Sequence, residues 1–159
     1  MDLHLPAAFL EADLFRLPQR LTGTFDVSLS FGLVEHFRGG CQRAVAAAHA
    51  RLVRPGGLVI ISVPYAMCLP YRLQKFYLEV RGWWPYPDEY PLSRRALRGL
   101  ARAAGLVPRW TMTSGYRRAT FALAGEVGLP RSAAGRFRSH PLDRCLGMDL
   151  TLCAQKPTD

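Results

Sequence analysis

The features that mark secreted and membrane proteins are scarce in this sequence of 159 residues. Its four cysteines form no C-x-x-C pair and are too sparse for a disulfide framework, which favours a reduced, cytoplasmic protein. The longest uncharged run, residues 55–71, contains three prolines and two glycines and is too broken to cross a membrane. The first residues lack the basic leader of a signal peptide. We therefore expect a cytoplasmic protein with no membrane contact.

Clusters of like charge are also lacking. The chain has 21 basic and 12 acidic residues, a formal net charge of +9, and only two of the basic residues are lysine. A basic protein can bind nucleic acid through the release of counterions. Here the arginines are scattered, no basic run occurs, and no nucleic-acid-binding motif accompanies them. We therefore do not expect nucleic acid as a partner; steep salt dependence would be the mark of an RNA-binding module.

What the sequence does have is the composition of a folded domain. Hydrophobic residues make up 49% of the chain and charged residues 21%, which suits a packed core and excludes intrinsic disorder and a coiled coil. The length corresponds to about one domain, and no internal repeat or interdomain linker is visible.

The clearest local pattern is a strand, a helix and a second strand. Apolar and polar residues alternate over residues 24–31, which is the period of a strand. Apolar residues at three- and four-residue steps predict a helix over residues 41–53, ended by Pro55-Gly56-Gly57. The run at residues 58–63 is apolar almost throughout and is typical of a strand buried on both faces of a parallel sheet. Together they predict one βαβ unit.

Further elements follow an aromatic-rich segment at residues 64–92, which holds eight of the 17 aromatic residues. Within this segment residues 69–81 suit a short helix. Ser93 is a good N-cap for a helix that ends at Gly105. Strands are predicted at residues 107–114 and 149–156, with a short helix between them at residues 118–127.

Three features in order resemble the class I S-adenosylmethionine-dependent methyltransferases. TFDVSLSF is followed by GLVEHF, then by a helix that runs into LVRPGG and an apolar strand. The resemblance implies an α/β, Rossmann-like methyltransferase fold, with a mostly parallel sheet and an antiparallel last strand. It places residues 8–15 (AFLEADLF) at the end of the family's third strand. It also implies S-adenosylmethionine as cofactor and a small-molecule methyl acceptor as partner.

The resemblance assigns cofactor contacts at the carboxyl ends of two strands. Asp13 would accept a hydrogen bond from the adenine amino group, with the amide of Leu14 beside it. Ser30, Phe31 and Gly32 would line the methionine and sulfonium end. The alternatives are that Asp13 is a strand-terminating acid and Phe31 a core ring.

Catalysis and acceptor binding have weaker candidates. A hydroxyl acceptor can need a general base, and His36, which follows the cofactor strand, is the candidate; it could equally pack against the next helix. Tyr65, Trp83, Trp84 and Tyr86 could wall a pocket for a flat or apolar acceptor, or could form the core of a folded lid. No spacing among histidines, cysteines and acids suits a metal site, so we expect none.

The glycine fingerprint of this family is absent. No G-x-G occurs in the 159 residues, so residues 1–159 are expected to form a partial methyltransferase domain without its first two strand–helix units. The strand at residues 27–31 would then be a sheet edge with an uncovered apolar face. Another polypeptide, a missing N-terminal part or the segment AFLEAD would have to cover it. The chain is thus either a truncated or mis-started methyltransferase, or a non-catalytic partial fold that acts as a binding or partner subunit.

Overall fold

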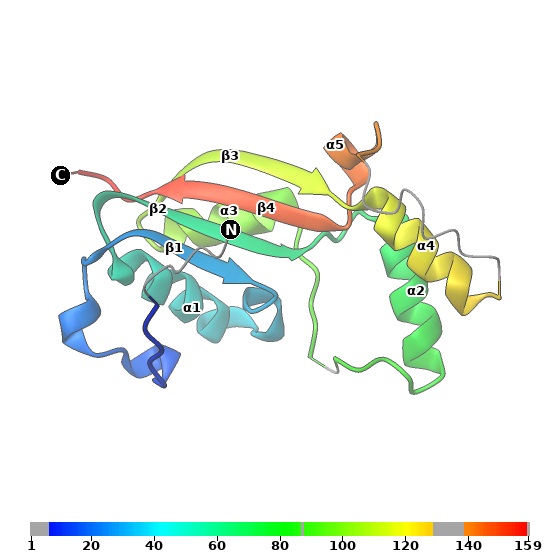
Figure 1. Cartoon of the computed structure of the whole chain (residues 1–159), viewed down its shortest axis with the longest axis horizontal. Coiled ribbons are helices and arrows are strands. Elements are labelled where there is room, and N and C mark those ends of the chain that lie inside the picture. The colour runs from blue at the N-terminus through cyan, green and yellow to red at the C-terminus, as the bar shows by residue number, and fades with distance from the viewer. Residues whose placement is uncertain (1–6, 87, 129–138, 159) are drawn as a thin grey trace.

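A computed structural model describes residues 7–86, 88–128 and 139–158 (Figure 1). Among these residues, there are four strands, which form one sheet, and five α-helices. The elements in chain order are β1 (Phe25–Phe31), α1 (Gly39–Leu52), β2 (Val53–Pro64), α2 (Leu69–Val80), α3 (Arg94–Ala103), β3 (Val107–Ser114), α4 (Tyr116–Glu126), α5 (Asp143–Leu146) and β4 (Asp149–Gln155).

The strand order and directions confirm the predicted fold class. The sheet has the order β1-β2-β4-β3, with β1 and β2 parallel and β4 antiparallel to both of its neighbours. Strands β1, β2 and β3 therefore run in one direction, and the last strand runs against them between β2 and β3. Only β4 is reversed, but it takes part in two of the three strand pairs, so the sheet has one parallel and two antiparallel pairs.

The predicted turn at Pro55-Gly56-Gly57 lies inside a longer strand. The register of β1 against β2 jumps from the pair Phe25–Val53 to the pair Val27–Leu58. The intervening residues of β2, which include Pro55, Gly56 and Gly57, form an irregularity in the ladder. The strand can therefore contain a proline and two glycines and still continue to Pro64. The βαβ unit is therefore present as predicted, with a connection from α1 into β2 that leaves no separate loop.

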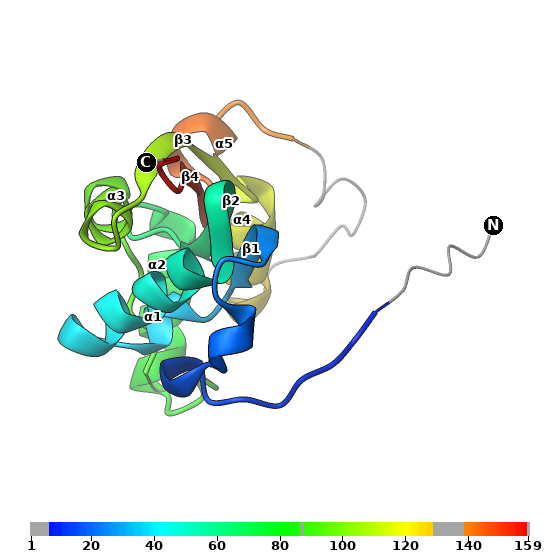
Figure 2. The same ribbon diagram turned by 90° about the vertical axis from the view of Figure 1, so that its left-hand side faces the viewer.

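Helices α1 and α3 cover one face of the sheet. Figure 2 shows both helices together on one side of the strands, and α1 contacts β1 and β2 while α3 contacts β3 and β4. The central strands present apolar side chains to these helices, namely Val59, Ile61, Val63, Leu150 and Leu152. Ser93 caps α3 as predicted, since its Oγ atom accepts a hydrogen bond of 3.2 Å from the amide of Ala96.

The other face of the sheet is largely exposed. On β1, the small side chains of Ser28 and Ser30 pack beneath α1, so the apolar residues point away from the core. Register places these residues on one surface with alternate residues of β3. We call this surface the open face; its exposed large residues are Phe25, Val27, Leu29, Phe31, Val107, Trp110 and Met112.

The segment AFLEADLF is not a strand, contrary to the resemblance. Residues 7–13 are without regular structure, and Leu14–Arg16 form a turn of 3₁₀ helix. A β-strand needs a neighbouring strand to pair with by backbone hydrogen bonds. This segment instead packs toward α1 rather than beside β1. Strand β1 therefore remains an edge of the sheet in the described part of the chain, and the segment does not cover it. Among the described residues, no helix is long and apolar enough to cross a membrane.

Candidate functional site

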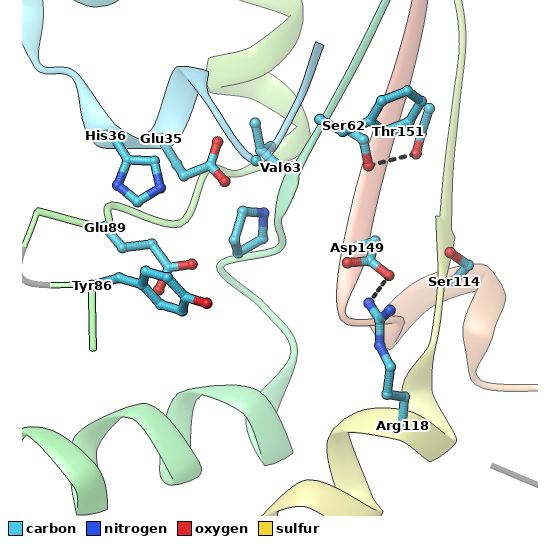
Figure 3. Close-up of a pocket in the computed structure, with 13 residues that line it drawn as sticks. Glu35, His36, Ser62, Val63, Tyr86, Glu89, Ser114, Arg118, Asp149 and Thr151 are labelled. Carbon is cyan, nitrogen blue, oxygen red and sulfur yellow. Dashed lines mark hydrogen bonds and ion pairs between the residues drawn. The ribbon is translucent and has the colours of Figure 1, made fainter. Parts of the chain in front are cut away.

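A pocket of about 580 Å³ opens at the carboxyl ends of the parallel strands. In open α/β sheets this end is where ligands bind, because the strand-to-helix loops converge there. The pocket is walled by residues at the ends of β1, β2 and β3, by the turn after β1, by the start of β4, and by side chains from the segment before α3 and from α4 (Figure 3). The fold thus brings segments between Phe31 and Thr151 to one cavity.

Four of the residues predicted for the site line this pocket: Phe31, Gly32, His36 and Tyr86. Gly32 follows β1 directly and has a φ of +66°, a conformation that side chains disfavour. Its amide donates to the carbonyl of Ser62 at 3.1 Å, which ties the turn to β2. A Cβ atom here would lie 3.6 Å from Oε1 of Glu35, so the glycine is needed for its backbone angle rather than for space.

The ring of His36 is held by the segment before α3. Its Nδ1 atom lies 3.1 Å from the carbonyl oxygen of Asp88, and its ring meets Tyr86 edge-on at 6.2 Å between centroids. A carbonyl oxygen can only accept, so Nδ1–H donates this hydrogen bond and Nε2 carries the free lone pair. The ring of His36 therefore contacts Tyr86 and Asp88, and its tautomer is the one that a base acting through Nε2 requires.

The remaining predicted cofactor residues lie outside the pocket. Asp13 is exposed and uses its carboxylate to cap the 3₁₀ turn, accepting from the amide of Phe15 at 2.9 Å. Leu14 packs against the core. The hydroxyl of Ser30 is buried on the helix-covered face and has no hydrogen-bond partner. Its side chain therefore points away from the cavity.

Of the four aromatic residues predicted for the acceptor pocket, only Tyr86 lines it. Tyr65 is buried and forms a bridge to Leu92, so it belongs to the core. Trp84 packs edge-on against Tyr71 and Tyr86, at 6.1 and 5.9 Å between centroids. Trp83 is 62% exposed and lies against Arg81. Of these three, Trp84 contacts Tyr86 directly.

Glu35 is the most deeply buried charged group of the site. It lies in a 3₁₀ turn (Val34–His36), is 1% exposed, and its Oε2 atom has no hydrogen-bond partner. Burial raises the pKa of this carboxyl, and the nearby carboxylates of Glu89 and Asp149 raise it further, while its own backbone amide and His36 lower it. An unpartnered carboxylate oxygen in a cavity wall is a ready acceptor for a bound donor.

Glu89 and Asp149 add two more carboxylates to the same cavity. Glu89 is 9% exposed, and its Oε2 atom lies 3.9 Å from Nζ of Lys75, which is bound more closely by Glu79 at 2.8 Å. Burial raises the pKa of Asp149, and the ion pair of its carboxylate with Arg118 of α4 offsets part of that rise. Figure 3 shows this pair across the cavity from Glu35, His36 and Glu89.

Sequence reasoning missed the acidic residues of the pocket. Glu35 stands beside His36 in the motif GLVEHF, so this motif is the sequence signal that indicates it. Glu89 and Asp149 lie 60 positions apart, and no periodicity or spacing connects them. Among the described residues, no group of three or more histidines, cysteines and acids could hold a metal ion.

Solved structures show the same fold. A Thermotoga maritima S-adenosylmethionine-dependent methyltransferase, named as a possible histamine N-methyltransferase, matches with a TM-score of 0.62 at 15% identity, over 92% of this chain and 63% of its own. The Haloferax volcanii complex with the Trm112 methyltransferase activator matches at 0.59 and 18% identity, over 94% of this chain and 62% of that one.

A third match is a Burkholderia thailandensis N1-methyltransferase with bound 1,6-didemethyltoxoflavin and S-adenosylhomocysteine. It has a TM-score of 0.55 at 18% identity, over 94% of this chain and 50% of that one. The present chain thus spans between half and two thirds of these proteins, and it has the class I methyltransferase fold over that length. No protein-family model and no curated protein matches the sequence.

Proposed function

We propose that the protein takes part in S-adenosylmethionine-dependent methyl transfer to a small molecule. The observation that carries this proposal is the pocket at the carboxyl ends of β1 and β2, in a sheet with the strand order and reversed last strand of the methyltransferase fold. The cofactor supplies an activated methyl group, so the protein has mainly to align the acceptor and exclude water.

The residues at the end of β1 fit one end of such a cofactor. The turn at Gly32 brings backbone rather than a side chain to the cavity wall, and the exposed ring of Phe31 offers an apolar surface beside it. We place the methionine and sulfonium end there. The contacts proposed for Asp13, Leu14 and Ser30 need rearrangement, since Asp13 is engaged as a cap and the Ser30 side chain faces the core.

His36 is proposed as the base that receives the acceptor proton. The carbonyl of Asp88 fixes its Nδ1–H, which leaves Nε2 able to take a proton in a wall of the same pocket. Tyr86 flanks it and contributes an aromatic surface for a flat acceptor. A cavity of about 580 Å³ has the size of ordinary small-molecule sites.

The rest of the cofactor site is proposed to lie beside β1. This strand is an edge of the described sheet and bears the open face, so a further strand and its helices would both pair with β1 and cover that face. A glycine-rich turn on that unit would complete the site. The unit would belong either to a longer form of this polypeptide or to another chain.

Calorimetric titration with S-adenosylhomocysteine tests the cofactor role. Binding by the full chain, weakened by Gly32→Val and unaffected by Gly99→Ala on the exposed side of α3, is the expected result. The larger side chain strains a positive φ in the pocket wall, whereas nothing lies within 4 Å of a Cβ atom at Gly99. Incorporation of labelled methyl groups into small amines and alcohols would then test transfer. Unchanged affinity in Gly32→Val would contradict the placement.

A second candidate function is that of a non-catalytic partner subunit. It is favoured by the open face, where all seven large residues on β1 and β3 are between 43% and 65% exposed. One structural match is itself a complex with a methyltransferase activator. Tight binding of S-adenosylmethionine by the purified chain alone would count against this candidate; binding only after addition of a partner would support it.

A further inference from the structure

The charge of the pocket is opposite to that of the protein. The chain carries a formal net charge of +9, yet the pocket wall holds three carboxylates, from Glu35, Glu89 and Asp149, and one guanidinium, from Arg118. Since the chain has only 12 acidic residues, a quarter of them meet in this cavity. A negative cavity in a basic protein selects for cations, because the rest of the surface repels them.

The three carboxylates are not equally compensated. Asp149 is paired with Arg118, and Glu89 has Lys75 at 3.9 Å, a cation shared with Glu79. Glu35 has only the imidazole of His36 beside it and keeps one oxygen without a hydrogen bond at 1% exposure. A buried carboxylate without a partner is costly, and a bound donor relieves that cost. Glu35 is therefore the carboxyl of the pocket that the protein compensates least.

We infer that the pocket binds a methyl acceptor that carries a protonated amine, with the ammonium group held by Glu35 and assisted by Glu89. This inference rests on the proposed function and concerns recognition of the acceptor. An ammonium group has three donors and can satisfy both the free oxygen of Glu35 and Oε2 of Glu89, which likewise lacks a hydrogen bond.

The neighbouring ring favours the same class of acceptor. Tyr86 lines the pocket on the side of Glu35, His36 and Glu89, as Figure 3 shows. An aromatic ring near a carboxylate pair suits an amine attached to a flat skeleton, since the ring can contact both the skeleton and the cation. A carboxylate-bearing acceptor would instead meet like charge, because Arg118 is already engaged by Asp149.

Three probes with one skeleton and different charges test the inference: 2-phenylethylamine, 2-phenylethanol and phenylacetate. Their dissociation constants for the full chain are measured by calorimetry at pH 7.5. We expect the amine to bind about tenfold more tightly than the alcohol, as a charge-assisted hydrogen bond predicts, and the acid to bind least. Glu35→Gln should remove most of the preference for the amine, and Glu89→Gln part of it.

The matched control is Glu11→Gln, which removes the same charge from an exposed residue outside the pocket and should leave the preference intact. Circular dichroism checks that each variant is folded. Equal affinities for amine and alcohol, preference for the acid, or no binding of any probe overturns the inference. So does a loss of preference that is the same in Glu11→Gln.

The sulfonium and amino groups of the cofactor are a second source of positive charge. S-adenosylhomocysteine, which lacks the sulfonium, is therefore titrated into the same variants. If Glu35→Gln weakens the binding of S-adenosylhomocysteine as much as that of the amine, the carboxylate serves the cofactor and the inference fails. If the amine binds as expected and S-adenosylhomocysteine does not, the proposed cofactor role fails while the amine site stands.

Discussion

The Oγ atom of Ser28 lies 2.7 Å from Nδ1 of His49, joining β1 to the buried side of α1. Both residues are buried, with exposures of 7% and 6%. This pair explains how a strand can turn its polar residues inward, because the hydroxyl finds its partner on the helix instead of in water. It also leaves the apolar residues of β1 on the open face.

Burial lowers the pKa of His49, which makes stability depend on pH. In the unfolded chain this histidine binds a proton near its ordinary pKa of about 6.5, whereas in the folded chain it resists protonation to lower pH. The contribution of neutral His49 to the free energy of unfolding is therefore complete above about pH 6.5. It is lost as the pH falls toward the lower pKa that His49 has in the folded chain. We expect the free energy of unfolding to fall between pH 7 and pH 5, by at most about 1.4 kcal/mol per pH unit from this group.

Urea denaturation at several pH values, with wild type and His49→Gln, measures this effect. The variant is expected to be less stable at pH 7.5, because the hydrogen bond to Ser28 is altered, but to show a shallower slope between pH 7 and pH 5. Parallel slopes for the two proteins would show that His49 is not the group responsible.

The buried carboxyl of Glu35 should lower stability at neutral and alkaline pH. Burial raises the pKa of this carboxyl, so the folded protein favours its protonated form. The free energy of unfolding therefore decreases as the pH rises from 4.5 toward the pKa of Glu35 in the folded protein. Glu35→Gln is expected to raise the free energy of unfolding at pH 8 by about 1 kcal/mol or more. The gain should shrink near pH 4.5.

Thermal and urea unfolding at pH 4.5 and pH 8 provide the measurement, with Glu11→Gln as the exposed control that stays within about 0.5 kcal/mol of wild type. A Glu35→Gln protein that is destabilised equally at both pH values would mean that its carboxylate is satisfied. Taken with the amine titrations, a stability gain would identify Glu35 as a residue kept for binding at the expense of folding.

Substitution by alanine should change the free energy of unfolding in opposite directions at two glycines. A Cβ atom at Gly147, which precedes β4, would overlap the backbone of Ser114, whose oxygen would lie 2.6 Å away. Gly147→Ala is therefore expected to cost about 1–3 kcal/mol and to disturb the pocket wall at Ser114. Gly99→Ala, in the interior of α3 with free space around it, should gain about 0.5–1 kcal/mol. Equal effects of the two changes on the unfolding midpoint would contradict this contrast.

The elements of this fold could be predicted because their signals are local. The alternation of residues 24–31 identified a strand, and Ser93 identified a helix start, and both are confirmed. The covered face of β1 could not be predicted from alternation, because period two does not tell which set of side chains meets a helix. In the structure the covered set is Ser28 and Ser30, and Ser28 bonds to His49, 21 residues away in the sequence.

The site was less accessible to sequence reasoning than the fold. Gly32 and His36 follow β1 closely in the sequence, so predicting the strand also predicts that both lie near its carboxyl end. Glu89 comes from the segment before α3 and Asp149 from the start of β4. The tertiary fold brings both to the same cavity, and a single sequence does not show that proximity. The segment around Asp13 was predicted as a strand end, but its local preference for a capped turn prevails where no ladder is offered.

Neighbouring residues on β1 and β2 allow the open face to be tested directly. Leu29 is 56% exposed, whereas Ile61, which faces the helices from the adjacent strand, is 1% exposed. Ile61→Ala should cost about 2–5 kcal/mol, as a cavity in a packed core does, and Leu29→Ala less than about 1 kcal/mol. Urea denaturation measures both, and sedimentation at two concentrations measures self-association, which Leu29→Ala should reduce because an exposed apolar edge strand promotes it. A cost for Leu29→Ala comparable to that of Ile61→Ala would mean that the purified protein already covers this face.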